Sequence, residues 1–174
     1  MEYLAYIDPK SLTEKQALGD VGAGEGVGLH MTLCYFFMDP VLSKPLIADL
    51  SSISFLPFYM KAQSIEHFDK GHTVLEFSCP AGLQRLHEDI VDAVRTYADA
   101  DLEKTISKYY LGNFRPHVTI SKQGQTSYED IGALVGHEEY VDSFSLVRKV
   151  DEEWQKWLDF YGSQSLEHSC ERFK

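Results

Sequence analysis

Two short segments of the chain share one pattern, and that pattern restricts the folds that the chain can adopt. Residues 30–33 read HMTL and residues 117–120 read HVTI. Each lies in an apolar run that favours a β-strand, over residues 29–37 and 115–121. Because side chains alternate between the two faces of a strand, each segment places a histidine and a threonine on one face and two apolar side chains on the other. The chain therefore needs a sheet that is covered on one face and open on the other.

The rest of the chain supplies further strands and several helices. Apolar residues at steps of three and four predict an amphipathic helix over residues 80–98. Shorter helices are expected over residues 11–18, 43–53 and 128–135. Strands are expected over residues 2–7, 55–68, 73–77, 141–147 and 154–161, the last of which is also compatible with the start of a helix. This order of elements indicates an α+β fold with mainly antiparallel sheet.

Length and charge narrow the classes of function. The chain has 174 residues without a Pro/Ser-rich linker or a low-complexity segment, so we expect residues 1–174 to form one compact unit. Its formal net charge is −11. Such a chain lacks the basic surface that binds long nucleic acids or anionic membranes, whereas a small anion in a local pocket remains compatible with it.

Cysteine usage and hydropathy indicate an intracellular protein. The three cysteines are far apart and form no Cys-x-x-Cys pair, which is typical of reduced thiols and of neither a disulfide framework nor a zinc knuckle. No apolar run approaches the roughly 20 residues that span a bilayer. The first residues carry an acid where a signal peptide has positive charge. We therefore expect a cytoplasmic protein, and we expect it to be a monomer.

The polar side chains of the two matching segments form a set suited to phosphodiester chemistry: His30, Thr32, His117 and Thr119. Transfer at a phosphodiester without a metal needs a base for the incoming oxygen, an acid for the leaving oxygen and donors for the non-bridging oxygens. Histidine suits both proton-transfer roles because its pKa is about 6.5. The other histidines have no serine or threonine two residues later, and we expect them to be structural: His67, His72, His87, His137 and His168.

At these residues the sequence resembles the 2H phosphoesterase superfamily, which is named after two His-x-[Ser/Thr]-hydrophobic motifs. It is most similar to the 2′-5′ RNA ligase-like proteins and cyclic phosphodiesterases. The second motif is the closer match, because residues 114–121, FRPHVTIS, also contain the proline that usually precedes the histidine. The resemblance implies two pseudo-symmetric lobes with antiparallel sheets around a central cleft, helices on the outer faces, and one motif from each lobe in the cleft. It also implies catalysis without metal or cofactor.

One segment departs from the family pattern. Family members commonly have a longer first helix before the first motif, whereas this chain has a short predicted helix and the glycine-rich segment Gly19–Gly28. That segment precedes a strand-like run and opens no helix, so it does not match a dinucleotide-binding fingerprint. We interpret it as a surface loop, and the alternative is a flap over a bound anion.

Four further residues are candidates for substrate binding: Tyr35, Arg115, Lys122 and Arg148. Tyr35 could stack on a base, with core packing as the alternative. The three cations lie on or beside the strands expected to form the cleft, where one of them could bind phosphate.

These features predict a metal-independent phosphoesterase that acts on a nucleotide cyclic phosphodiester, such as a 2′,3′-cyclic phosphate, or on a 2′-5′ phosphodiester. His30 and His117 are the expected catalytic residues, and Thr32 and Thr119 the expected phosphate ligands. The expected partner is a small nucleotide or an RNA terminus. One alternative is a module that binds nucleotides or RNA ends with little catalysis. The other is a structural protein in which the matching segments are coincidence, which would place the two imidazoles more than ~10 Å apart.

Overall fold

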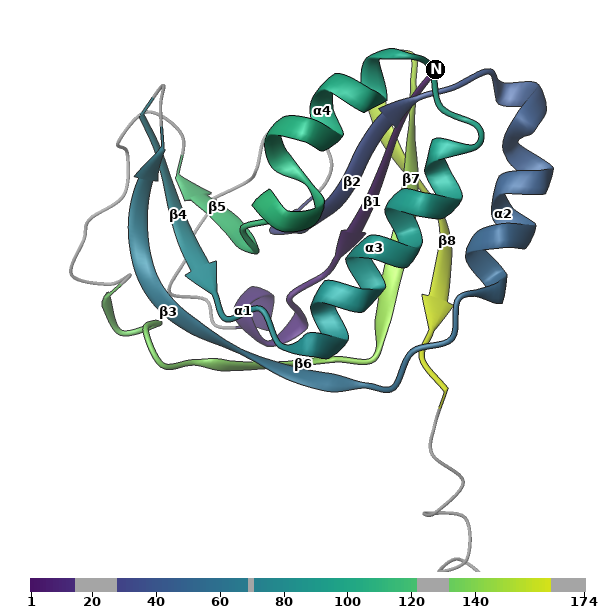
Figure 1. Ribbon diagram of the computed structural model, residues 1–174. Helices are drawn as coiled ribbons and strands as arrows, with labels where there is room; N and C mark the ends of the chain where they lie inside the picture. The colour runs from purple at the N-terminus through teal and green to yellow at the C-terminus, as the bar shows by residue number, and fades with distance from the viewer. Residues whose placement is uncertain (15–27, 69–70, 122–131, 164–174) are drawn as a thin grey trace, which may run out of the picture.

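The computed structural model describes residues 1–14, 28–68, 71–121 and 132–163 of the chain. These residues form an eight-stranded sheet with strand order β6-β3-β4-β5-β2-β1-β7-β8 (Figure 1). Every neighbouring pair of strands in the sheet is antiparallel. The strands are β1 (Glu2–Ile7), β2 (Met31–Phe37), β3 (Phe58–Phe68), β4 (His72–Phe77), β5 (His117–Ser121), β6 (Glu138–Val141), β7 (Ser143–Val150) and β8 (Glu153–Tyr161).

The sheet consists of two halves that meet at β2 and β5. One half, which we call the outer-chain half, contains β2, β1, β7 and β8; the other, the mid-chain half, contains β5, β4, β3 and β6. Each half has a motif strand at the centre of the whole sheet. The expected α+β fold with two related antiparallel halves is therefore confirmed.

Helices cover one face of this sheet (Figure 1). They are α1 (Lys10–Glu14), α2 (Ser43–Ser52), α3 (Ala81–Arg95) and α4 (Asp101–Tyr109), with short 3₁₀ turns at Pro40–Leu42 (η2) and Leu111–Asn113 (η4). The amphipathic pattern expected over residues 80–98 is confirmed, because α3 buries its apolar stripe, Leu83, Leu86, Ile90 and Val94. This stripe joins the main core with apolar side chains of the motif strands, among them Met31, Leu33, Val118 and Ile120. The helices thus provide the covered face that both motifs require.

Several helix and strand boundaries in the structure differ from those predicted from the sequence. Helix α4 was not expected, because its segment carries mixed charge and buries only Leu102 and Ile106. The stretch 141–147 belongs to two strands, β6 and β7, and residues 154–161 form a strand, β8. Residues 15–18 of the first expected helix, residues 128–131 of the last one and most of the glycine-rich segment lie outside the described residues. Among the helices that the structure describes, none is long and apolar enough to span a membrane.

Candidate active site

The two motifs meet where β2 and β5 pair. Met31 lies opposite Val118 in this antiparallel pair, and both side chains are fully buried beneath the helices. This register places His30, immediately before β2, across from Thr119, and places Thr32 across from His117. Directly opposed residues of neighbouring antiparallel strands have Cβ atoms about 4.5–5.5 Å apart. Both histidines and both threonines therefore share one small area on the face away from the helices, which we call the motif face.

Both imidazoles are oriented by the same backbone contact. His30 Nδ1 lies 2.9 Å from the carbonyl oxygen of Gly28, and His117 Nδ1 lies 2.7 Å from the carbonyl oxygen of Arg115. A carbonyl oxygen can only accept a hydrogen bond, so in each ring Nδ1 carries the proton. In the neutral ring of each histidine, Nε2 is therefore the nitrogen that can accept a proton. In both motifs the carbonyl belongs to the residue two positions before the histidine, so this contact follows the pseudo-symmetry of the sheet.

Each imidazole also packs against an aromatic ring. The Tyr6 ring meets His30 edge-on with centroids 5.8 Å apart, and the Phe68 ring meets His117 in the same manner at 4.8 Å. Burial lowers the pKa of His117, and the Arg115 guanidinium lowers it further. The hydrogen bond to the Arg115 carbonyl and the charge of Glu76 oppose this shift. His117 is therefore neutral near pH 7 in the absence of ligand.

A carboxylate and a guanidinium lie beside His117. Glu76 of β4 is opposite His117 in register, and its Oε1 accepts a hydrogen bond of 2.8 Å from Arg115 Nε. The guanidinium carbon of Arg115 lies 5.1 Å from the centroid of the Phe68 ring. Arg115 thus lies near the second motif, as the sequence suggested, but it is already paired. Glu76 and Phe68 were not predicted from the sequence, because the β4–β5 pairing brings Glu76 to His117 and the β3–β4 pairing brings Phe68 there.

Opposed residues continue across the motif face as one row. On the outer-chain half, Thr32 is followed by Tyr6, Ser145 and Asp159 on β1, β7 and β8. On the mid-chain half, His117 is followed by Glu76 and Ser64 on β4 and β3. Members of such a row point to the same side of the sheet. The row therefore shows which side chains flank the motifs in each direction.

The outer-chain half carries an apolar cluster on the motif face. Leu4, Tyr6 and Val147 form a second buried cluster, against which Tyr35 and Trp154 pack. Tyr35 joins this face because the β1–β2 register shifts between Ala5 and Tyr6. The Tyr35 hydroxyl donates to Glu2 Oε2 at 2.9 Å, and burial together with Glu2 raises its pKa to about 12. Tyr35 is therefore held beside the motif face, outside the helix-covered core.

The structure does not bring Arg148 to the motifs. Arg148 pairs with Tyr3, whose side chain belongs to the helix-covered core, and its guanidinium carbon lies 5.0 Å from the centroid of the Trp157 ring. It therefore points to the opposite side of the sheet from His30 and His117. Lys122 lies outside the described residues. Within the described ranges, no group of three or more His, Cys, Asp or Glu side chains is close enough to hold a metal ion.

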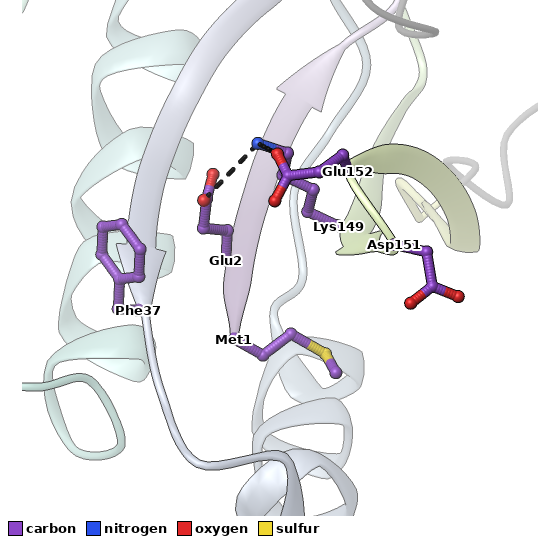
Figure 2. Close-up of a pocket in the computed structure, with 6 residues that line it drawn as sticks. All are labelled: Met1, Glu2, Phe37, Lys149, Asp151 and Glu152. Atoms are coloured by element: carbon purple, nitrogen blue, oxygen red, sulfur yellow. Dashed lines mark ion pairs between the residues drawn. The ribbon is translucent and has the colours of Figure 1, made fainter.

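A cavity of about 370 Å³ lies at the far end of the outer-chain half, away from the motifs. Figure 2 shows its lining: Met1, Glu2, Phe37, Lys149, Asp151 and Glu152. The Lys149 ammonium sits 2.7 Å from a Glu152 carboxylate oxygen and 3.7 Å from one of Glu2. Its positive charge is thus balanced by carboxylates, and the cavity does not resemble a phosphate site.

Comparison with known proteins relates the chain to one family. The model of the 2′-5′ RNA ligase superfamily matches residues 10–148. Among solved structures, TT0787 of Thermus thermophilus superposes with a TM-score of 0.64 at 19% identity, covering 94% of this chain and 100% of that one. E. coli LigT complexed with 3′-AMP gives a TM-score of 0.62 at 14% identity, covering 94% and 98%. LigT complexed with NADP+ gives 0.61 at 14%, with the same coverage. No curated protein matches the sequence.

Proposed function

The chain belongs to the 2′-5′ RNA ligase superfamily, and on that basis we propose that it hydrolyses a nucleotide cyclic phosphodiester, such as a 2′,3′-cyclic phosphate, or a 2′-5′ phosphodiester. The family assignment supports activity on phosphodiesters in general. The observation that carries the finer proposal is the register of Met31 with Val118, which brings each histidine opposite the threonine of the other motif. The area that these four side chains share is small enough for one phosphate group to lie between the two imidazoles.

The proposed reaction uses the two histidines in opposite protonation states. His117, whose pKa is lowered, accepts at Nε2 the proton of the attacking water. The water oxygen forms a bond to phosphorus as the bond to the ribose oxygen breaks. His30 donates its Nε2 proton to that leaving oxygen, which leaves a phosphate monoester and a free hydroxyl. Thr32 and Thr119 donate hydrogen bonds to the non-bridging oxygens, where negative charge develops.

The expected substrate is a small nucleotide or the end of an RNA. The nucleotides bound in the LigT structures support this class, and the apolar surface around Tyr35 and Trp154 offers contact area for a base or ribose. In this proposal both halves of the sheet contribute to one site, so the chain acts as a single unit. We also propose that it is a monomer and that it works in the cytoplasm.

A substrate panel tests the proposed function. It would contain a nucleoside 2′,3′-cyclic phosphate, a 2′-5′-linked dinucleotide, its 3′-5′ isomer and an RNA with a cyclic phosphate end, each with and without EDTA. We expect turnover of at least one of the first two or of the RNA end, at a rate that EDTA does not change. Binding of these nucleotides without product would favour the alternative, a nucleotide-binding module.

A further inference from the structure

The two sides of the motif face differ in character, and that difference bears on which substrates fit. On the outer-chain half the side chain opposite Thr32 is the aromatic ring of Tyr6, which lies with Leu4 and Val147 in a buried cluster, and the same row continues to Ser145 and Asp159. On the mid-chain half the side chain opposite His117 is the Glu76 carboxylate, and Glu66 lies one row further, opposite the buried Val74, which itself faces Thr119. A substrate that spans the motifs therefore has a neutral aromatic neighbour in one direction and a carboxylate in the other.

Glu76 is a fixed negative charge at the edge of the site. Its carboxylate accepts from Arg115 Nε at 2.8 Å, and Ser64 Oγ lies 3.4 Å from its second oxygen. The hydrogen bond from Arg115 holds the pKa of Glu76 below its usual range, against the opposing effect of burial. The side chain is only 20% exposed. Glu76 therefore stays ionised at neutral pH and is shielded from solvent screening more than an ordinary surface carboxylate.

The same ion pair engages Arg115, the cation that precedes the second motif. Arg115 Nε is engaged by Glu76, the guanidinium lies over Phe68, and Glu66 adds a second negative charge in its surroundings. Glu66, Glu76 and Arg115 together carry a net negative charge. A phosphate monoester carries about −1.5 to −2 charges at pH 7. Placed toward β4, such a group meets the Glu76 carboxylate.

Resting on the proposed function, we infer that this chain acts on substrates without a second phosphate on the mid-chain side of the motifs, and that Glu76 is the residue that rejects such a phosphate. The favoured class is a nucleoside cyclic phosphate without a 5′-phosphate. In place of phosphate, the Glu76–Arg115 pair offers an acceptor and a donor to a neutral polar group, such as a ribose hydroxyl or a base edge.

Two substrates that differ in one group test this inference. They are adenosine 2′,3′-cyclic phosphate and the same compound with a 5′-phosphate, compared by kcat/KM at low ionic strength and pH 7.5. For the wild-type chain we expect a preference of about tenfold or more for the compound without the 5′-phosphate. Salt should reduce this preference, because it screens the repulsion. The salt series needs no variant, so it tests the inference even if a substitution impairs folding.

Glu76→Gln keeps the shape of the side chain and removes its charge. We expect this variant to lower the preference at least about fivefold, chiefly by raising kcat/KM for the 5′-phosphorylated compound. Asp159→Asn, which lies three strands from Thr32 along the same row, should have a smaller effect. Asp101→Asn is the matched control, because Asp101 pairs with Lys104 on α4 at 2.8 Å and is remote from the motif face.

The outcomes separate the inference from the proposed function. A wild-type preference for the 5′-phosphorylated compound, or a preference that neither salt nor Glu76→Gln changes, would overturn the role of Glu76. Absence of hydrolysis of both compounds by the wild-type chain would reject the proposed function, and this inference with it.

Discussion

Met31 lies opposite Val118 where β2 and β5 meet, and this pairing places each threonine opposite the histidine of the other motif. Thr32 faces His117, and Thr119 faces His30, so in the proposed mechanism each imidazole shares its side of the phosphate with the hydroxyl of the other motif. The arrangement requires both halves of the sheet, and it ties the mechanism to one register.

Replacing either threonine removes one donor without disturbing the strand. We expect Thr32→Val and Thr119→Val to lower kcat by about 10²-fold, because each hydroxyl acts on charge that develops in the transition state. Valine has nearly the shape of threonine and favours strands, so the melting temperature should change little. Thr105→Val on α4, whose hydroxyl donates to the Asp101 carbonyl at 3.3 Å, is the control and should retain full kcat. Unchanged kcat in both motif variants would remove the threonines from the mechanism.

The pH dependence of kcat/KM should reflect the protonation of His117. A base must be neutral, so activity rises as pH rises through the pKa of His117, which burial and Arg115 hold below its ordinary value of 6.5. Glu76→Gln removes a charge that raises this pKa, so the acidic limb should move to lower pH. Arg115→Gln removes a charge that lowers it, so the limb should move to higher pH. Shifts in the same direction for both variants would contradict this electrostatic account.

His87 should make folding stability fall in mild acid. Its Nδ1 donates to the Leu33 carbonyl and its Nε2 accepts from the Leu111 N–H, both at 3.0 Å, and burial lowers its pKa to about 4. Because the folded state binds the proton more weakly than the unfolded state, stability is complete above pH 6.5 and is lost as pH falls toward 4. Between pH 7 and 5 this loss is about 2 kcal/mol.

Urea unfolding at the two pH values measures this loss. His87→Gln should be less stable at pH 7, because it loses the stacked contact with Phe114, whose ring centroid lies 3.9 Å from that of His87. Its stability should also depend less on pH than that of the wild-type chain. An equally steep pH dependence in the variant would show that another group is responsible.

Arg115 and Arg148, two of the cations expected on or beside the strands of the cleft, should differ in their effect on catalysis. Arg148→Ala should leave kcat/KM within about twofold of the wild-type value, because its side chain lies against Trp157 on the opposite side of the sheet from the motifs. Arg115→Ala should lower kcat/KM at least about tenfold, because this substitution leaves the Glu76 carboxylate unpaired beside His117. Equal effects of the two substitutions would contradict the assignment of faces.

How much of the site could be predicted from the sequence depends on the range of the interaction. The faces of His30 and Thr32, and of His117 and Thr119, follow from alternation within one strand, which is a local property. The position of Glu76 depends on how β4 pairs with β5, and that of Tyr35 on a register shift against β1. Neither pairing leaves a signal in a single sequence.

Arg148 illustrates the same limit. It lies on β7, but its side chain points to the helix-covered face of the sheet. This is evident only from its pairing with Tyr3 of β1, which is far away in the sequence. Helix α4 was missed for a different reason: it is short, it carries mixed charge, and its buried residues are Leu102 and Ile106. The α+β class, in contrast, follows from many segments at once, so it survived errors in individual boundaries.

The central claim is that His30 and His117 together transfer protons at one phosphodiester. The most direct measurement is single-turnover hydrolysis of a nucleoside 2′,3′-cyclic phosphate in EDTA by the wild-type chain, His30→Ala and His117→Ala, with folding checked by circular dichroism. The proposed mechanism predicts a loss of about 10²–10⁴-fold in each variant, with no restoration by added divalent metal. Hydrolysis at the wild-type rate by either folded variant would contradict it.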